Sequence, residues 1–181
     1  ENIDASEAWE IEQGNTEVVV AIIDGPIHNS CGDSTCYHED LAENMWKNEN
    51  DTPGNGIDED GNGYIDDYYG YDFTNNGDSE PFENFGEDEV NDCMGHATAV
   101  AGVMGAKGNN NIGIAGVTWN VKIMPLQILT AVGNNCEIYG GYSGWSDTAI
   151  EAINYAAIMN VKIANISWAA ENVNVNDFIG L

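Results

Sequence analysis

The sequence contains no arginine and only four lysines, against 31 aspartate and glutamate residues, which gives a formal net charge of −27. Such a surface repels nucleic-acid phosphates and anionic lipid headgroups, so the composition argues against nucleic acid and membrane as partners. The same charge suits a well-solvated, salt-tolerant or cation-binding protein.

Long hydrophobic runs are absent as well. The longest run near the start, Val18–Ile23, is far too short to cross a bilayer, and no secretory signal peptide is visible. Residue 1 is glutamate, which predicts a mature or partial chain. In contrast, 43% of the 181 residues are hydrophobic, with five Trp, eight Tyr and four Phe. This content predicts one folded domain with a substantial core.

Cysteine is scarce but even in number, and three complete pairings are possible. The four are Cys31, Cys36, Cys93 and Cys136. In an acidic, lysine-poor chain an even count favours an oxidising, extracellular setting, with four reduced thiols as the alternative. A short disulfide between Cys31 and Cys36 is favoured over a zinc site with His28 and His38, because that ligand spacing is unusual for structural zinc.

Apolar segments alternate between strand-like and helix-like patterns. The β-branched run from Glu17 to Ile23 is typical of a strand buried on both faces of a parallel sheet, and small residues predict a helix over Gly95–Gly105. The pattern also predicts a helix over residues 5–13 capped by Ser6, a strand over Val121–Leu129, a helix over Ser146–Met159 and a strand over Lys162–Ile166. We therefore expect an α/β fold with an open parallel sheet flanked by helices.

An acidic segment over residues 49–92 shows little helical or strand periodicity, and loops of this length are usually functional or ordered by a ligand. Residues 58–66 within it match the first nine positions of an EF-type calcium loop, with a solvated acidic turn as the alternative. The predicted ligands are Asp58, Asp60, Asn62, the carbonyl of Tyr64, and Asp66. Position 12 is Tyr69 rather than Glu, so a bidentate ligand would come from Asp67 or Asp72.

Two residues are candidates for catalysis. Asp24 directly follows the apolar run, and a carboxylate at such a position is costly to bury unless it is hydrogen-bonded or paired. His96 opens the helix of small residues, where the helix dipole disfavours a protonated ring unless a carboxylate offsets it. Alone, each residue would more often be structural. Together they predict a base paired with an aspartate, as activation of a nucleophile requires, at the carboxyl edge of the sheet.

Five motifs in chain order surround this pair. They are Val19–Asp24, His38–Leu41, Gly95–Gly102, Asn109–Val117 and Asn165–Trp168. Each alone is weak, but together they resemble the subtilisin-like serine proteases (subtilases, peptidase family S8) over residues 5–170. The resemblance implies a three-layer α/β fold, incomplete at its C-terminus. Residues 1–181 would be the N-terminal portion of the peptidase domain, with residues 49–92 as an insertion.

In this resemblance Asp24 orients and charge-stabilises His96, which takes a proton from a serine and passes it to the leaving amine. The sequence departs from the family pattern at Gly25-Pro26 and at Ala97. The family's serine lies in a Gly-Thr-Ser turn on the order of 150 residues after the histidine. We therefore expect the nucleophile beyond residue 181, and no peptide hydrolysis by residues 1–181 alone.

The resemblance also implies binding residues. A polypeptide substrate would lie along Gly141, Tyr142, Ser167, Trp168 and Ala169. A second calcium ion would take Asp40, the side chain of Asn110, and the carbonyls of Gly108, Ile112 and Ile114, although the same residues also suit an ordinary turn. An inhibitory propeptide or the rest of the catalytic domain would be further partners.

Two functions remain open at this point. The first is an extracellular serine endopeptidase with an Asp/His/Ser triad and calcium. The second is a non-catalytic, calcium-binding relative that keeps the fold for binding. Retention of Asp24 and His96 favours the first, because a non-catalytic relative needs neither residue.

Overall fold

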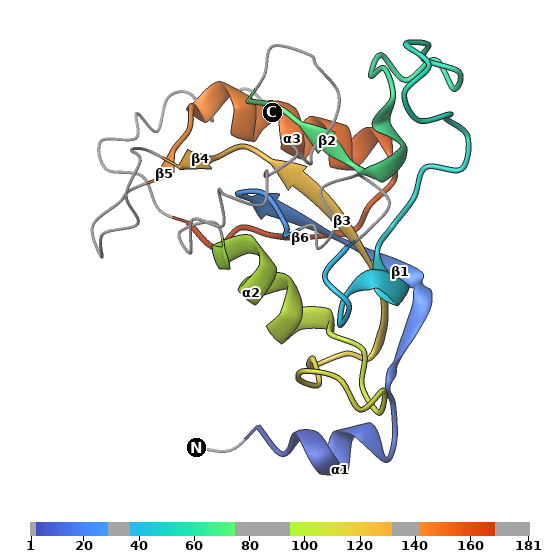
Figure 1. Cartoon of the computed structure of the whole chain (residues 1–181), viewed down its shortest axis with the longest axis vertical. Helices are drawn as coiled ribbons and strands as arrows, with labels where there is room; N and C mark the ends of the chain where they lie inside the picture. The colour runs from blue at the N-terminus through green and yellow to red at the C-terminus, as the bar shows by residue number, and fades with distance from the viewer. Residues whose placement is uncertain (1–2, 29–36, 75–94, 132–141, 169–181) are drawn as a thin grey trace.

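A four-stranded parallel sheet forms the centre of the protein (Figure 1). The computed structural model describes residues 3–28, 37–74, 95–131 and 142–168. The strands are β1 (Gly14–Asp24), β2 (Tyr71–Asp72), β3 (Asn120–Gln127) and β6 (Ile163–Asn165), in the order β2-β3-β1-β6. Every pair in this sheet is parallel. The predicted α/β fold with an open parallel sheet is therefore confirmed, and β1, β3 and β6 correspond to its three predicted strands.

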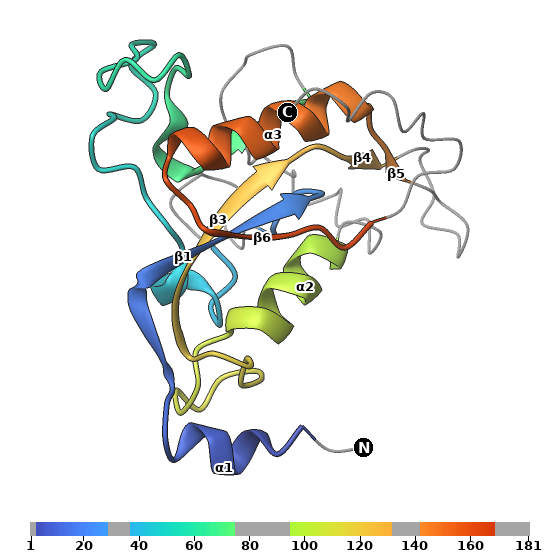
Figure 2. The same ribbon diagram turned by 180° about the vertical axis from the view of Figure 1, so that it is seen from behind.

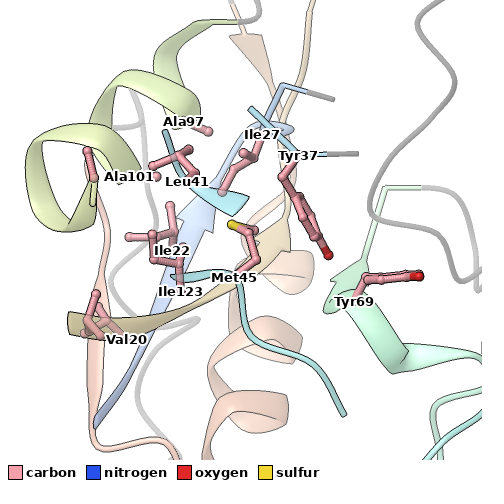
Figure 3. Close-up of a cluster of buried hydrophobic side chains, with 12 residues drawn as sticks. Val20, Ile22, Ile27, Tyr37, Leu41, Met45, Tyr69, Ala97, Ala101 and Ile123 are labelled. Atoms are coloured by element: carbon pink, nitrogen blue, oxygen red, sulfur yellow. The ribbon is translucent and has the colours of Figure 1, made fainter. Parts of the chain in front are cut away.

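Helices cover both faces of the sheet and make three layers (Figures 1 and 2). Helix α2 (Gly95–Gly105) lies on one face and α3 (Ser146–Ile158) on the other. Because successive side chains of a strand point to opposite faces, the core divides into two clusters. The cluster on the α2 side includes Val20, Ile22 and Ile123 (Figure 3), and the one on the α3 side includes Ala21, Ile23, Met124 and Leu126.

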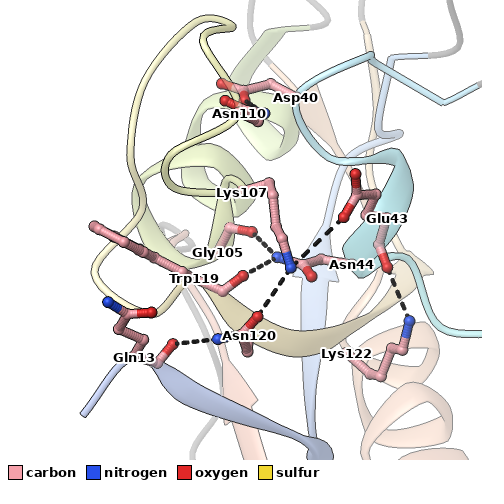
Figure 4. Close-up of polar contacts among 10 residues, drawn as sticks. All are labelled: Gln13, Asp40, Glu43, Asn44, Gly105, Lys107, Asn110, Trp119, Asn120 and Lys122. Atoms are coloured by element: carbon pink, nitrogen blue, oxygen red, sulfur yellow. Dashed lines mark hydrogen bonds and ion pairs between the residues drawn. The ribbon is translucent and has the colours of Figure 1, made fainter. Parts of the chain in front are cut away.

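Helix α2 packs close to the sheet because its inward residues are small. Ala97 is fully buried, so the methyl group at this departure from the family pattern fills core space. A Cβ atom on Gly105 would come within 2.7 Å of Val121 Cγ1. Asn44, which ends the short 3-10 helix η1 (Ala42–Asn44), donates to the Gly105 carbonyl at 2.8 Å (Figure 4). Both ends of α2 are thus fixed against the sheet.

The N-terminal helix is shorter than predicted. Helix α1 spans Ala5–Trp9 rather than residues 5–13, and it is preceded by Asp4 in the left-handed region, with φ 51°. The predicted cap at Ser6 is wrong, because its hydroxyl donates to the Glu7 carboxylate at 2.8 Å. Ile11 is 88% exposed, so no core contact extends the helix beyond Trp9.

The acidic segment contains a strand that its sequence did not predict. Strand β2 adds to the edge of β3 through the pair Tyr71↔Leu126, and Phe73 is buried in the α3-side cluster. Before it, residues 48–69, here called the acidic loop region, form turns and the 3-10 helix η2 (Asp67–Tyr69) (Figure 1). Residues 75–92 of the predicted insertion lie outside the described residues.

The remaining strands lie near the carboxyl edge and the side of the sheet. Strands β4 (Thr130–Ala131) and β5 (Tyr142–Ser143) form an antiparallel pair after β3. Strand β6 is an edge strand whose one strand partner among the described residues is β1, and Ile163 and Ile166 are 51% and 44% exposed. None of the helices in the described ranges is both long and apolar enough to span a membrane.

Candidate active site

Asp24 and His96 meet at the carboxyl edge of the sheet. Asp24 is the last residue of β1, and His96 is the second residue of α2. Asp24 Oδ1 and His96 Nδ1 are 2.9 Å apart, which is a hydrogen-bond distance. Asp24 is fully buried, whereas the His96 side chain is 43% exposed. A buried carboxylate thus holds one nitrogen of an imidazole ring that a solvent-borne molecule can reach.

The backbone around this pair is fixed by further hydrogen bonds. The Gly25 amide donates to Asp24 Oδ1 at 2.7 Å, so this oxygen accepts two bonds. The hydroxyl of Thr98, two residues after His96, accepts a bond from the His28 amide at 2.7 Å. The strand end, the loop that follows it and the first turn of α2 are therefore tied together.

A row of buried polar side chains crosses the sheet at the level of Asp24. Asp72 of β2 pairs in register with Gln127 of β3, and Gln127 pairs with Asp24. Asp24 and Asp72 are fully buried, and Gln127 is 6% exposed. The sequence analysis did not assign Gln127 to the site. Its signal was positional, because it ends an apolar strand in the same way as Asp24.

The predicted substrate strand continues β6 toward this edge. Asn165, the last residue of β6, pairs with Ile22, which lies two residues before Asp24, and Ser167 follows two residues after Asn165. Ser167 is exposed and donates to Asn165 Oδ1 at 2.7 Å, while Trp168 packs against the α3-side cluster. Of the other predicted substrate residues, Tyr142 lies in β5, and Gly141 and Ala169 lie outside the described residues.

The predicted calcium loop wraps around its first residue. The Asp58 carboxylate accepts hydrogen bonds from the amides of Gly61, Asn62 and Gly63 at 2.7, 3.1 and 2.9 Å. Gly63, the sixth position of the loop, has a φ of +96°, the left-handed conformation that a sharp turn requires. Asp60 accepts a bond from the Asn62 amide at 3.0 Å. This geometry fits the first six positions of an EF-type loop.

The later positions of the loop make other contacts. Asp66 accepts hydrogen bonds from the backbone amides of Asn55 and Gly56 at 2.9 and 3.0 Å. Its carboxylate therefore stabilises the turn that precedes the loop. The ring of Tyr64 packs against core aromatic rings. Across the ranges that the structure describes, no group of three or more His, Cys, Asp or Glu side chains is arranged to hold a metal ion.

Asp67 anchors the acidic loop region to α3. It is fully buried and accepts bonds from Nδ2 of the Asn48 and Asn62 side chains at 2.5 and 2.7 Å and from the Tyr155 hydroxyl at 2.8 Å. Burial, together with the charge of Asp67, raises the pKa of Tyr155. The other residue considered as a bidentate ligand, Asp72, lies in the sheet. The sequence could not reveal this anchor because its partners are far apart along the chain.

Asp51 and Glu59 form a pair of interacting carboxyl groups in the same region. Asp51 is 4% exposed and accepts bonds from the amides of Glu59 and Asp67 at 3.3 and 2.8 Å. Burial raises the pKa of Asp51 to about 6, and the hydrogen bond with Asp51 lowers the pKa of Glu59 to about 2. The pair therefore holds one proton between these values of pH.

The second predicted calcium site brings Asp40 and Asn110 together (Figure 4). Asp40 is buried, and its two oxygens accept bonds from Asn110 Nδ2 at 2.9 Å and from the Ile114 amide at 2.8 Å. Asn110 Oδ1 accepts a bond from the Ile112 amide at 3.0 Å. Gly108 packs against the indole ring of Trp119, and a Cβ atom on Gly108 would lie only 2.0 Å from that ring. The loop is thus closed around Asp40 by hydrogen bonds.

Comparison with known proteins identifies the family of the chain that carries this site. The subtilase family model matches residues 15–178, so the chain belongs to the subtilase family. At the level of the family, this membership supports a serine protease.

Curated relatives are named as proteases and are much longer. Subtilisin-like protease 1 of Plasmodium falciparum (isolate 3D7) is 39% identical over 88 residues, which cover 48% of this chain and 11% of that protein. Subtilisin-like protease 2 of the same isolate is 32% identical over 123 residues, covering 67% and 8%. The thermophilic serine proteinase of Bacillus sp. (strain AK1) is 28% identical over 164 residues, covering 91% and 29%. The chain therefore spans less than a third of each of these proteins.

A solved structure supports the fold. The crystal structure of MycP1 with the N-terminal propeptide removed matches with a TM-score of 0.51 and 17% sequence identity. The match covers 92% of this chain and 36% of that one. At this identity the likeness concerns the fold alone, and it agrees with the predicted three-layer α/β class.

Proposed function

We propose that residues 1–181 are the N-terminal part of the catalytic domain of a serine endopeptidase and supply its base. The observation that carries the proposal is the 2.9 Å contact between Asp24 Oδ1 and His96 Nδ1, at the carboxyl edge of the sheet of a subtilase. In this role Asp24 keeps the proton on Nδ1, which leaves Nε2 as the basic nitrogen. The carboxylate also stabilises the imidazolium that forms when a serine gives up its proton.

In this proposal the serine lies in a Gly-Thr-Ser turn beyond residue 181. Its oxygen attacks the scissile carbonyl, and His96 passes the proton it has taken to the leaving amine. Residues 1–181 alone would then hold a base with no nucleophile to activate, and we expect them not to hydrolyse peptides.

We infer that the substrate is an extended polypeptide in a cleft along Ser167 and Trp168, with Gly141, Tyr142 and Ala169 completing it. The support is the pairing of β6 beside β1 up to Asn165, two residues before Ser167, and the exposure of Ser167. Unfolded proteins such as casein are the expected substrates, because an extended chain is needed to lie along a strand.

Labelling with a fluorophosphonate probe tests the catalytic role. The protein extended through its Gly-Thr-Ser turn should be labelled, and His96→Ala should abolish the labelling, whereas His28→Ala should keep it. Labelling of residues 1–181 alone would show that the nucleophile lies within them. An extended, folded protein that has the turn but stays unlabelled would favour the non-catalytic relative.

We propose that calcium binds the loop of residues 58–66 and a second site at Asp40 and Asn110. The support for the first site is the turn around Asp58 and the left-handed Gly63, and the support for the second is the short distance between Asp40 and Asn110. Oxygen donors of this kind suit a hard cation, which would also reduce the repulsion within a chain of net charge −27.

Calorimetric titration with calcium tests these sites. Asp58→Asn should weaken one binding event, whereas Glu10→Gln, which removes an exposed carboxylate directly after α1, should leave the isotherm unchanged. Chelation should also speed hydrogen exchange in residues 55–72 before the rest of the chain. An isotherm with no heat beyond dilution would exclude both sites.

We further propose that the protein is extracellular and that an inhibitory propeptide binds it. The support for the location is the even number of cysteines in a lysine-poor, acidic chain, and the support for the propeptide is membership of the subtilase family. Mass spectrometry of the unreduced protein should find the disulfide between Cys31 and Cys36. Four free thiols would contradict an oxidising compartment.

A further inference from the structure

The carboxylate of Asp24 is only half satisfied. Oδ1 accepts bonds from the Gly25 amide and from His96, whereas Oδ2 is buried and meets no hydrogen-bond donor among the described residues. A buried carboxylate oxygen without a donor costs free energy, because it has lost its water and gained nothing in exchange. A donor near Oδ2 would remove that cost and would also fix the plane of the carboxylate.

Gln127 stands on the adjacent strand with an unused hydrogen-bonding capacity. It is 6% exposed, and its Oε1 is likewise buried with no donor in the described part of the chain. Its Nε2 carries two hydrogens, and the single bond that it makes there is a long one, 3.4 Å to the Leu129 carbonyl. The amide therefore has a second N–H to give.

The sheet places these two side chains next to each other. Asp24 and Gln127 are paired in register across β1 and β3. Alternation along the strands puts both on the α2 side, because Ile22 and Ile123, two and four residues earlier, belong to the α2-side cluster. Neighbouring strands are about 4.8 Å apart, a distance that a glutamine side chain spans easily.

We propose that the Gln127 amide donates a hydrogen bond to Oδ2 of Asp24 and acts as a positioning residue for the Asp24–His96 pair. Three donors then hold the carboxylate: the Gly25 amide and His96 on one oxygen, and Gln127 on the other. The bond from His96 to Oδ1 is kept in this arrangement, because Gln127 uses the other oxygen of the carboxylate. Asp24 is left with one rotational setting, which aims Oδ1 at the imidazole.

A neutral amide is well suited to this position. A charged donor would cancel part of the negative charge that Asp24 offers to the imidazolium of His96, whereas an amide fixes the carboxylate and leaves that charge in place. Asp72, fully buried on the other side of Gln127, would be a second carboxylate in the row. The amide therefore also separates two buried acids.

NMR titration of the three histidine rings tests this role in residues 1–181, with no need for catalysis. Gln127→Met keeps the length of the side chain and removes the donor. Without this donor the Asp24 carboxylate would interact more strongly with the protonated His96 ring. The titration midpoint of that ring should therefore move to higher pH by about half a unit. The rings of His28 and His38 serve as internal references. Gln13→Met, the same change at the other glutamine of the chain, should move none of them.

An unchanged His96 midpoint in a folded Gln127→Met protein would overturn the proposal. If that variant fails to fold, the NMR spectrum of the unsubstituted protein tests the proposal instead. One of the two Nε2 protons of Gln127 should be shifted downfield and should follow the titration of His96. Two averaged Nε2 protons that ignore this titration would overturn the proposal as well.

An effect of Gln127 on catalysis rests on the function proposed above, whereas the hydrogen bond from Gln127 to Asp24 does not. In the extended protein Gln127→Met should lower kcat about tenfold with little change in KM, because the orientation of the base matters in the transition state. If the extended protein has no protease activity and the His96 midpoint still moves, the proposed function fails and this inference stands.

Discussion

The edge of the sheet around Asp24 and the acidic loop region are held together in different ways. At the sheet edge, fully buried apolar residues such as Ile22 and Ile123 position a small number of polar atoms. In the acidic loop region the contacts are mostly hydrogen bonds to carboxylates, among them Asp51, Asp58 and Asp67. Hydrophobic packing does not depend on protonation, whereas carboxylate contacts do. The rigid part and the part that responds to solution conditions are therefore separate.

The largest effect is expected where one buried atom orients the base. Asp24→Asn keeps the packing of the sheet edge but favours the wrong tautomer of His96. In the extended protein it should reduce turnover by about 10⁴, the loss that the general triad template gives for this change. Steady-state hydrolysis of casein measures it, with Asp147→Asn on α3 as the control. A loss below about tenfold would mean that Asp24 does not set the tautomer.

Stability should depend on the sheet rather than on apolar residues of the acidic loop region. Ile123→Ala removes a fully buried side chain and should lower the free energy of unfolding by about 2–5 kcal/mol. The matched change Ile57→Ala, at a residue that is 57% exposed, should cost within about 0.5 kcal/mol. Urea denaturation measures both. Equal losses would contradict the contrast between the two regions.

The anchor between the regions should have an intermediate effect. Tyr155→Phe keeps the ring in the core and removes only the hydroxyl that donates to Asp67 at 2.8 Å. Because the acceptor is a buried carboxylate, the expected loss is about 1.5–3 kcal/mol. Tyr68→Phe, at a half-buried tyrosine, is the control. Hydrogen exchange should rise first in residues 48–69, and a uniform rise over the sheet would contradict the anchor.

The smallest effect should be a pH dependence confined to the acidic loop region. The pKa of Asp51 is raised to about 6 by burial, so the folded protein binds this proton more tightly than the unfolded chain does. The contribution of Asp51 to stability is therefore full below its ordinary range and is lost as pH rises toward 6. The pKa of Glu59 is lowered to about 2, so its contribution to stability is lost as pH falls toward 2.

Urea unfolding between pH 5 and about 7, with chelator present, measures this dependence. The stability of Asp51→Asn relative to the unsubstituted protein should increase across this range. A constant difference would show that Asp51 ionises as it does in the unfolded chain.

The sheet could be predicted because short, continuous runs of apolar residues identify buried parallel strands without reference to their partners. The same runs located Asp24, and helical spacing located His96. Strand β2 could not be found, because two residues carry no periodicity and Tyr71 becomes a strand residue only by pairing with Leu126. The early end of α1 also depends on tertiary structure, since Ile11 has nothing to pack against.

Only those site residues whose role follows from neighbouring residues in the sequence could be predicted. Asp58 and Gly63 follow a loop pattern that is written in consecutive residues. Gln127 and Asp67 could not be assigned, because their roles depend on neighbours supplied by other strands and by α3. A polar residue that ends an apolar strand is the one sequence signal that Gln127 and Asp24 share.

Strand β6 has a consequence for the colloidal behaviour of the protein. Among the described residues β6 pairs with β1 alone, so its other edge, with the half-exposed Ile163 and Ile166, is a place where another strand can add. The nearest charge that interrupts the apolar pattern is Lys162. Mutual repulsion between molecules that each carry a net charge of −27 at neutral pH opposes the pairing of two such edges. That repulsion disappears near the isoelectric point of about 4.1, so acidification of residues 1–181 alone should promote aggregation through paired β6 edges.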